Sequence, residues 1–178
     1  MLKQQGGNMN DVQKRKRKSK MDVMAEKLQK EFWSDIKDED LWDSSRNNGY
    51  APIPRTMSLI MNIIDDLSKN QPAGRAYFVL WCYRRPESSL VTIENPLVFA
   101  AETGFSGERA LTTWKQRMKI LQELGFIDAK EGSSGAFHYV LILNPHIVIQ
   151  KLKSNIQESR FRQIYSRALE IGAKDLEV

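Results

Sequence analysis

Residues 95–130 read NPLVFAAETGFSGERALTTWKQRMKILQELGFIDAK, and this stretch decides the fold. Asn95 followed by Pro96 is a typical helix start, because asparagine caps free backbone N–H groups and proline suits the first helical position. Gly104 supplies the left-handed residue that ends this first helix. Ser106 is then expected to cap a second helix. The pattern therefore predicts two helices joined by a sharp turn.

The second helix, which is predicted to run to about Leu124, has one apolar side and one polar side. Its apolar side consists of Ala110, Leu111, Trp114, Met118 and Leu121. Its polar side consists of Arg109, Thr112, Thr113 and Gln116, flanked by Lys115, Arg117 and Lys119. Arginine and glutamine can pair with purine edges, threonine can touch a thymine methyl group, and flanking cations can grip phosphates. The helix is expected to bury the first side and to offer the second to a DNA groove.

A two-stranded hairpin is predicted after this helix. Gly125 ends the helix, and residues 126–130 have the pattern of a strand. The glycine-rich turn 132–135 leads to a second strand over residues 137–143. The whole fold is therefore expected to be mainly α-helical with a small β-hairpin.

Two short runs resemble a known superfamily. Residues 100–106 (AAETGFS) resemble the turn of bacterial helix-turn-helix proteins, and residues 121–127 (LQELGFI) resemble the exit of a winged-helix recognition helix into its wing. The resemblance covers about residues 56–143 and implies a winged helix-turn-helix with helical extensions at both ends. It implies that the polar side of the second helix reads bases and that the hairpin tip meets the backbone or minor groove. The implied DNA-binding residues are Ser106, Arg109, Thr112, Thr113, Lys115, Gln116, Arg117, Lys119, Lys130, Ser133 and Ser134.

One feature departs from this pattern. The second helix is expected to be about one turn longer than in typical winged-helix repressors, and Ile120 lies on its polar side. Either Ile120 tucks under the wing, or this face binds protein instead of DNA.

The flanking segments differ strongly in composition. Residues 1–20 hold seven of the chain's 27 lysines and arginines with almost nothing to bury, and are expected to be a disordered tail. An amphipathic helix and an irregular acidic and aromatic segment are predicted over residues 21–54, the latter laid against the body through Trp42, Tyr50 and Ile53. The winged-helix domain is assigned to residues 55–153 and includes a helix at 56–69. Residues 75–85 are apolar nearly all round, which favours a buried central helix, with a buried strand as the alternative. A C-terminal amphipathic helix within residues 154–178 either packs back or forms a homodimer arm.

Composition excludes several classes of protein. The chain has 178 residues, 41% of them hydrophobic and 28% charged, which is typical of a globular protein. The chain contains neither an apolar run long enough for a membrane span nor a leader pattern, so a cytoplasmic location is expected. Cys82 lacks a disulfide partner and is expected to be an inert buried thiol.

Catalysis and metal binding are not expected. The acidic run between Asp35 and Asp43 lacks calcium-loop spacing, and His138 and His146 are expected to be surface or packing residues. The chain contains neither a phosphate-binding loop nor a nucleophile elbow. We therefore expect no enzyme activity, no metal and no cofactor.

These observations favour a sequence-specific double-stranded DNA-binding protein, a transcriptional regulator of bacterial or mobile-element type. A winged-helix replication initiator or accessory factor is the first alternative, because residues 139–145 (YVLILNP) are loosely similar to the end of plasmid initiators' winged domains. The second alternative is a protein-interaction adaptor with no DNA role, whose partner would bind residues 34–54.

Overall fold

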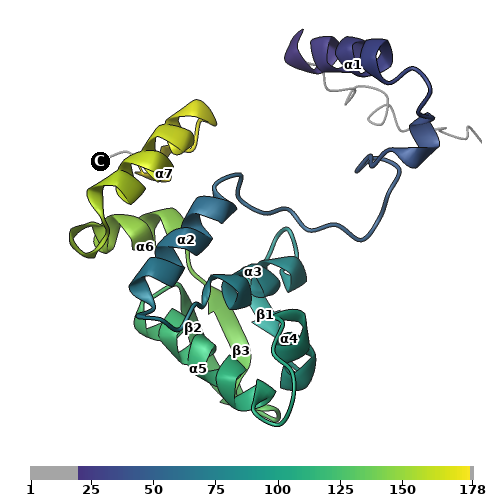
Figure 1. Cartoon of the computed structure of the whole chain (residues 1–178). Helices are drawn as coiled ribbons and strands as arrows, with labels where there is room; N and C mark the ends of the chain where they lie inside the picture. The colour runs from purple at the N-terminus through teal and green to yellow at the C-terminus, as the bar shows by residue number, and fades with distance from the viewer. Residues whose placement is uncertain (1–19, 177–178) are drawn as a thin grey trace, which may run out of the picture. The chain divides into compact units, whose positions relative to one another are not determined.

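The computed structural model describes residues 20–176, and the chain divides into two units, residues 1–48 and residues 49–178 (Figure 1). The basic segment 1–20 lies outside the described residues except for Lys20, so its expected disorder stays a prediction. Within residues 20–176, each helix is too short or too polar to cross a membrane.

The described residues form a mainly helical structure with one small sheet, which confirms the predicted fold class at this level. Seven α-helices and three short 3₁₀ turns (η) accompany a three-stranded antiparallel sheet. The elements are α1 Lys20–Phe32, η1 Asp38–Asp40, α2 Met57–Leu67, α3 Gly74–Tyr83, β1 Leu90–Thr92, α4 Pro96–Glu102, α5 Ala110–Glu123, β2 Ile127–Gly132, β3 Gly135–Ile142, α6 Pro145–Lys151, η2 Lys153–Asn155, α7 Glu158–Glu170 and η3 Lys174–Leu176.

The described part of the first unit, residues 20–48, has no buried residue. Helix α1 has no buried residue, and Phe32 and Trp33 meet edge to face at 5.9 Å between ring centroids while both stay exposed. Asp43 organises the following turn, because its Oδ1 accepts hydrogen bonds from the backbone N–H and the hydroxyl of Ser45 at 2.8 and 2.7 Å. These hydrogen bonds lower the pKa of the Asp43 carboxyl.

The expected anchoring of the acidic and aromatic segment is wrong for its two residues in the second unit. Tyr50 and Ile53 have exposed side chains, so neither serves as a buried anchor, whereas the contact of Trp42 with the body stays a prediction because Trp42 belongs to the first unit. The prolines that flank Ile53 hold this stretch extended, and an extended segment gains burial only where a complementary surface receives its side chains.

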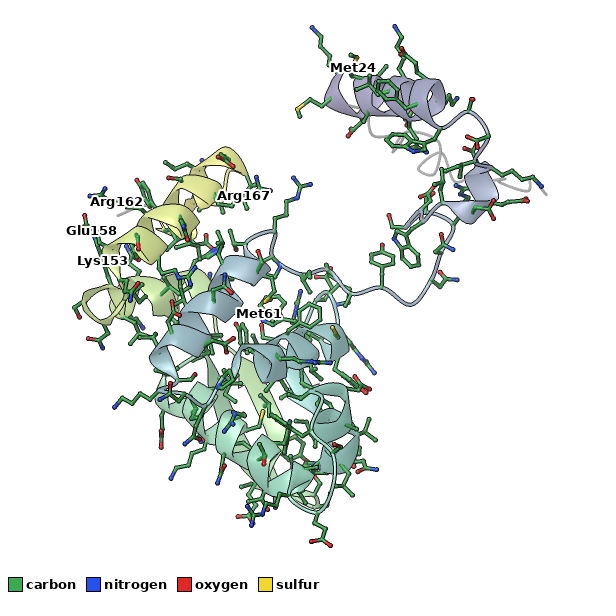
Figure 2. The ribbon with its side chains drawn as sticks, in the orientation of Figure 1. Met24, Met61, Lys153, Glu158, Arg162 and Arg167 are labelled. Carbon is green, nitrogen blue, oxygen red and sulfur yellow. The ribbon has the colours of Figure 1, made fainter. Side chains whose placement is uncertain are left out.

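The core of the second unit begins with α2 and α3, which cross closely at one glycine. The apolar stripe of α2 buries Ile60, Ile63 and Ile64. A Cβ atom at Gly74 would lie 2.8 Å from the carbonyl oxygen of Met61, which Figure 2 labels on α2. The backbone N–H of Gly74 also donates to Asp65 Oδ1 at 2.7 Å. Only glycine lets α3 begin so close to α2.

Helix α3 is less buried than its sequence predicts. Tyr77 and Leu80 are fully buried, but Cys82 and Tyr83 near the end of the helix are exposed. The prediction of a buried Cys82 is therefore wrong, because the last turn of α3 extends beyond the core. Partial burial and the nearby Glu102 carboxylate raise the pKa of the Cys82 thiol, which keeps it protonated.

The sheet has the order β1-β3-β2. In the centre of β3, Val140 pairs with Val91 of β1 on one side and with Ala129 of β2 on the other. Alternate residues of β3 face the helices, so His138 and Val140 are buried whereas Tyr139 is exposed.

Two helices follow the sheet. Sequence reasoning missed α6, although Asn144 and Pro145 repeat the Asn95–Pro96 signal: Asn144 Oδ1 accepts from the N–H of His146 at 3.0 Å. Helix α7 was predicted and packs on α2, where its Ile164 and Ala168 are buried. This confirms the alternative in which the C-terminal helix packs back.

Candidate nucleic-acid interface

The first half of the candidate interface is the connection between α4 and α5. Asn95 Oδ1 accepts from the N–H of Leu97 at 3.1 Å and caps α4 as predicted. Gly104 ends α4 with φ +94°, and Phe105 then turns inward and packs half-buried against the core. This half-buried aromatic ring packs at the junction of the two helices.

The expected start of α5 is wrong. Ser106 does not cap it: the helix begins at Ala110, and Arg109 occupies the cap position without a side-chain cap hydrogen bond. The cause is Gly107, whose φ of +76° lies outside the helical region and interrupts a helix that would otherwise begin there. The exposed Ser106 therefore lies in the linking turn. The helix has 14 residues, about one turn fewer than the span from Ser106 to Leu124 that the sequence predicts.

The two sides of α5 are as predicted. Ala110, Trp114, Met118 and Leu121 are buried, and the opposite side exposes Arg109, Thr112, Lys115, Gln116 and Lys119. We call these five residues the α5 polar face; Thr113 lies at its edge and is half-buried.

Most of the cationic and amide side chains of the α5 polar face have no partner in the described part of the fold. Within residues 20–176, the side chains of Arg109, Lys115 and Gln116 have neither an ion-pair nor a hydrogen-bond partner. Lys119 Nζ lies 3.7 Å from Glu123 Oε1, one turn further on, and both groups are well exposed. Such an exposed ion pair contributes little free energy, so Lys119 can leave Glu123 and pair with another anion. The surface therefore offers hydrogen-bond donors and positive charge at helical spacing.

Arg117 has a different environment from its neighbours on α5. Its Nη1 donates to Gln71 Oε1 at 3.0 Å, and its guanidinium lies 5.8 Å from the ring centroid of Phe105. Burial lowers the pKa of Arg117. The arginine thus links α5 to the α2–α3 connection and to the inserted ring, and its role here is to position these segments.

Ile120 belongs to a groove beside the C-terminal half of α5. The groove has a volume of about 450 Å³ and is lined by Leu67, Ser68, Lys69, Gln71, Gln116, Lys119, Ile120, Glu123 and Leu124. Ile120 is half-buried against the core and lines this groove together with Leu67 at the end of α2. Lys69, an exposed cation in the same groove, was missed: it stands next to α5 only because the chain turns there through two left-handed residues, Lys69 and Asn70 (φ +47° and +68°).

The hairpin formed by β2 and β3 has a tightly held tip. The Ser134 hydroxyl donates to the carbonyl oxygen of Ile93, and its oxygen lies 2.8 Å from His138 Nδ1. The backbone N–H of Ser134 also donates to His138 Nδ1, at 3.4 Å. The hydroxyl of Ser134 is therefore engaged inside the fold.

The remaining hairpin residues of the predicted set are accessible. Ser133 is exposed at the tip, and the exposed Lys130 Nζ lies 3.8 Å from Asp128 Oδ2 on the same strand. Both side chains can therefore reach a phosphate group.

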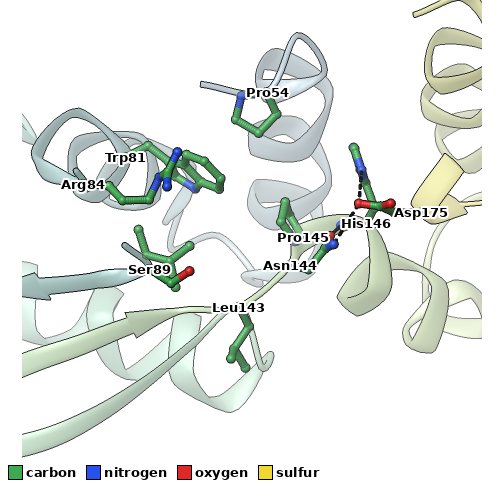
Figure 3. A pocket seen from close by; sticks show the side chains of 10 residues that line it. Pro54, Trp81, Arg84, Ser89, Leu143, Asn144, Pro145, His146 and Asp175 are labelled. Atoms are coloured by element: carbon green, nitrogen blue, oxygen red, sulfur yellow. Dashed lines mark hydrogen bonds and ion pairs between the residues drawn. The ribbon is translucent and has the colours of Figure 1, made fainter. Parts of the chain in front are cut away.

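A second cavity, of about 280 Å³, lies where β3 leads into α6 (Figure 3). Asp175 Oδ2 accepts from Asn144 Nδ2 at 2.8 Å and lies 4.0 Å from His146 Nδ1. His146 Nε2 is 2.8 Å from the hydroxyl oxygen of Thr56. This order of groups resembles a catalytic triad, but Thr56 is completely buried and is not among the residues lining the cavity. The contacts instead tie η3 and the start of α2 to α6.

His146 is a packing residue, as expected. Its burial lowers the pKa of the imidazole, and the Asp175 carboxylate acts in the opposite direction. Among residues 20–176, no group of three or more histidine, cysteine or acidic side chains is arranged to hold a metal ion.

Comparison with protein-family models, with curated proteins and with solved structures gives no match for this chain.

Proposed function

We propose that this chain is a sequence-specific double-stranded DNA-binding protein whose residues 55–153 form a winged helix-turn-helix. The order of elements supports this: α3, β1, α4, α5 and the β2–β3 hairpin follow one another, and β3 lies between β1 and β2. In such a domain α4 and α5 form the helix-turn-helix and the hairpin is the wing.

The observation that carries the proposal is the α5 polar face. It places Arg109, Lys115, Gln116 and Lys119 on the exposed side of a helix whose other side is anchored by Trp114. No acidic residue occurs in the chain from residue 109 to residue 122. A helix of this width fits the major groove, where arginine and glutamine recognise purines and lysines contact phosphates.

The hairpin would hold the backbone beside this groove. Lys130 and Ser133 are the accessible members of the predicted hairpin set, whereas the Ser134 hydroxyl stabilises the tip that presents them. We therefore assign base reading to α5 and backbone contact to the hairpin, with Lys69 as a further phosphate contact. A DNA-binding regulator of bacterial or mobile-element type, working in the cytoplasm, is the role that follows.

An adaptor function is a second candidate, favoured by the exposed aromatic side chains of the first unit. Trp33 and Trp42 are both more than half exposed. Tryptophans are enriched at the energetic centres of protein interfaces. In this case residues 34–54 would bind a protein partner, whether or not α5 binds DNA.

Two experiments with the full chain test the DNA-binding proposal. The first selects bound sequences from a random duplex pool; enrichment of a defined sequence is expected, and an unenriched pool would refute sequence-specific binding. The second measures affinity for duplex DNA against salt concentration. Lys115→Ala should reduce the slope of log affinity against log salt by about one.

Arg162→Ala is the matched control for the salt series. Arg162 is an exposed cation on α7 that pairs with Glu158, and its loss changes the net charge by the same amount. The slope should be unchanged in this variant. Equal effects of the two substitutions would show that net charge, and not α5, governs binding.

A further inference from the structure

The outward side of the sheet carries large apolar side chains. Leu90 of β1 and Tyr139 and Leu141 of β3 are each between 40% and 50% exposed. Leu143, directly after β3, is 36% exposed, and it also lines a groove of about 480 Å³ with Ile147 of α6. We call these five residues the outer sheet face.

This pattern departs from that of an ordinary solvated sheet. A sheet with one face in water normally alternates apolar and polar residues, so that the outward positions are polar. Here the inward positions of β3 already supply buried side chains, including Val140 and Ile142, yet the outward positions are also apolar. Contiguous exposed apolar patches of this kind mark interaction surfaces.

The pairing register makes this surface complementary to itself. Val91, Val140 and Ala129 lie side by side across the three strands. Consider a two-fold axis that lies midway between two stacked sheets, perpendicular to the strands and level with these three residues. Rotation about this axis would stack each strand on the same strand of the second copy, in the antiparallel direction. It would place Leu141 over Tyr139 of the second copy, because these residues lie on either side of Val140.

The charges at the edge of the sheet fit the same symmetry. On β2, Asp128 and Lys130 lie on either side of Ala129 and point outward together. The same two-fold axis would place Asp128 of each copy over Lys130 of the other. Each copy thus presents two large apolar side chains on β3, Leu90 and the exposed Thr92 on β1, and two opposite charges on β2. In the dimer these charges would pair with the second copy in place of their 3.8 Å contact within one chain.

We propose that the outer sheet face is the interface of a homodimer, in which two copies stack sheet on sheet about this two-fold axis. Stacked sheets lie about 10 Å apart, which leaves room for leucine and tyrosine side chains to interdigitate. The interface leaves the α5 polar face uncovered, because none of its residues lies on the sheet. It takes up Lys130, so in the dimer the backbone contact proposed for the hairpin is made by Ser133 and not by Lys130. The C-terminal helix is not the dimer arm, since its apolar residues Ile164 and Ala168 already pack on α2.

Analytical ultracentrifugation of the full chain over a concentration series tests the proposal without DNA. The wild-type protein should sediment with twice the mass of one chain. Leu141→Glu should raise the dissociation constant of the dimer at least about tenfold, because it buries a charge at the centre of the interface. Leu97→Glu and Leu169→Glu are the controls: both leucines are exposed, on α4 and α7, and neither change should alter the mass. Circular dichroism checks that all three variants fold.

A charge exchange tests the symmetry. Asp128→Lys alone and Lys130→Asp alone should each weaken the dimer, because each places like charges across the interface. An equal mixture of the two variants should dimerise again, since every contact then pairs opposite charges. A wild-type protein that stays monomeric would overturn the proposal. So would a dimer that survives Leu141→Glu, a dimer lost in Leu169→Glu, or a mixture that does not recover.

Discussion

The packing of His138 against Gly132 at the hairpin tip allows a sharp prediction for Gly132→Ala. A Cβ atom at Gly132 would lie 2.4 Å from Cδ2 and 2.6 Å from Cγ of the His138 ring. That ring is buried and held by Ser134, so it has little freedom to move away. Overpacking of this kind lowers the free energy of unfolding by about 1–3 kcal/mol. Replacing a glycine by alanine raises it by about 0.4–1 kcal/mol, because alanine reduces the conformational entropy of the unfolded chain. We expect a net loss of about 1–2 kcal/mol in the free energy of unfolding.

A double-mutant cycle measured by urea denaturation isolates this contact. In a His138→Ala background the two ring atoms are gone and only the Cβ contact at 2.9 Å remains, so Gly132→Ala should cost less than it does in the wild-type protein. Ser133→Ala is the control at the same tip, and its exposed side chain predicts a change within about 0.5 kcal/mol. An equal cost of Gly132→Ala in both backgrounds, or no cost in the wild-type protein, would show that the ring does not confine this glycine.

Three further changes probe the core and the helix caps. Trp114→Phe should lower the free energy of unfolding by less than about 1 kcal/mol, because the loss of two buried carbons is offset by removing an indole N–H that has no partner among residues 20–176. Trp114→Ala should lower it by about 3–5 kcal/mol. Equal losses for the two variants in urea denaturation would contradict this reasoning. Asn144→Ala should lower the melting temperature through a loss of about 0.5–2 kcal/mol, because the N-cap of α6 disappears together with the contact to Asp175; an unchanged melting temperature would contradict the cap. Because burial lowers the pKa of His146 from 6.5, the unfolded chain binds this proton more readily, so stability should fall as the pH drops below about 6.5. His146→Gln should flatten this part of the stability profile, and an identical pH slope in the two proteins would refute the assignment.

The elements that the sequence predicts well are those whose ends are encoded locally. Asn95 with Pro96 and Gly104 delimit α4, and Gly125 ends α5 with φ +81°. These signals act within one helical turn, so they do not depend on the rest of the fold. By the same rule α6 was predictable, because Asn144 with Pro145 repeats the signal that starts α4.

The start of α5 was not predictable in the same way. Ser106 has the side chain of a helix cap, but Gly107 can adopt either helical or left-handed dihedral angles. The structure uses the left-handed angle, and it does so where Phe105 turns into the core. The choice between the two conformations therefore depends on packing that local sequence patterns do not contain.

In the candidate site, too, local patterns were predictable from the sequence and long-range contacts were not. Helical periodicity alone predicted that Arg109 and Gln116 share an exposed side of α5. It could not predict that Arg117 meets Gln71, because the two residues are 46 positions apart in the chain. Nor could it predict the exposure of Cys82, which depends on where α3 leaves the core.

Base reading by α5 is tested most directly by a ratio of two dissociation constants, one for a duplex enriched from the random pool and one for a random duplex. Arg109→Ala combined with Gln116→Ala should bring this ratio close to one, since each base-specific pair contributes about 1–3 kcal/mol of discrimination. Lys115→Ala should weaken binding to both duplexes equally and keep the ratio. A ratio that stays at the wild-type value in the double variant would show that the α5 polar face does not read DNA sequence.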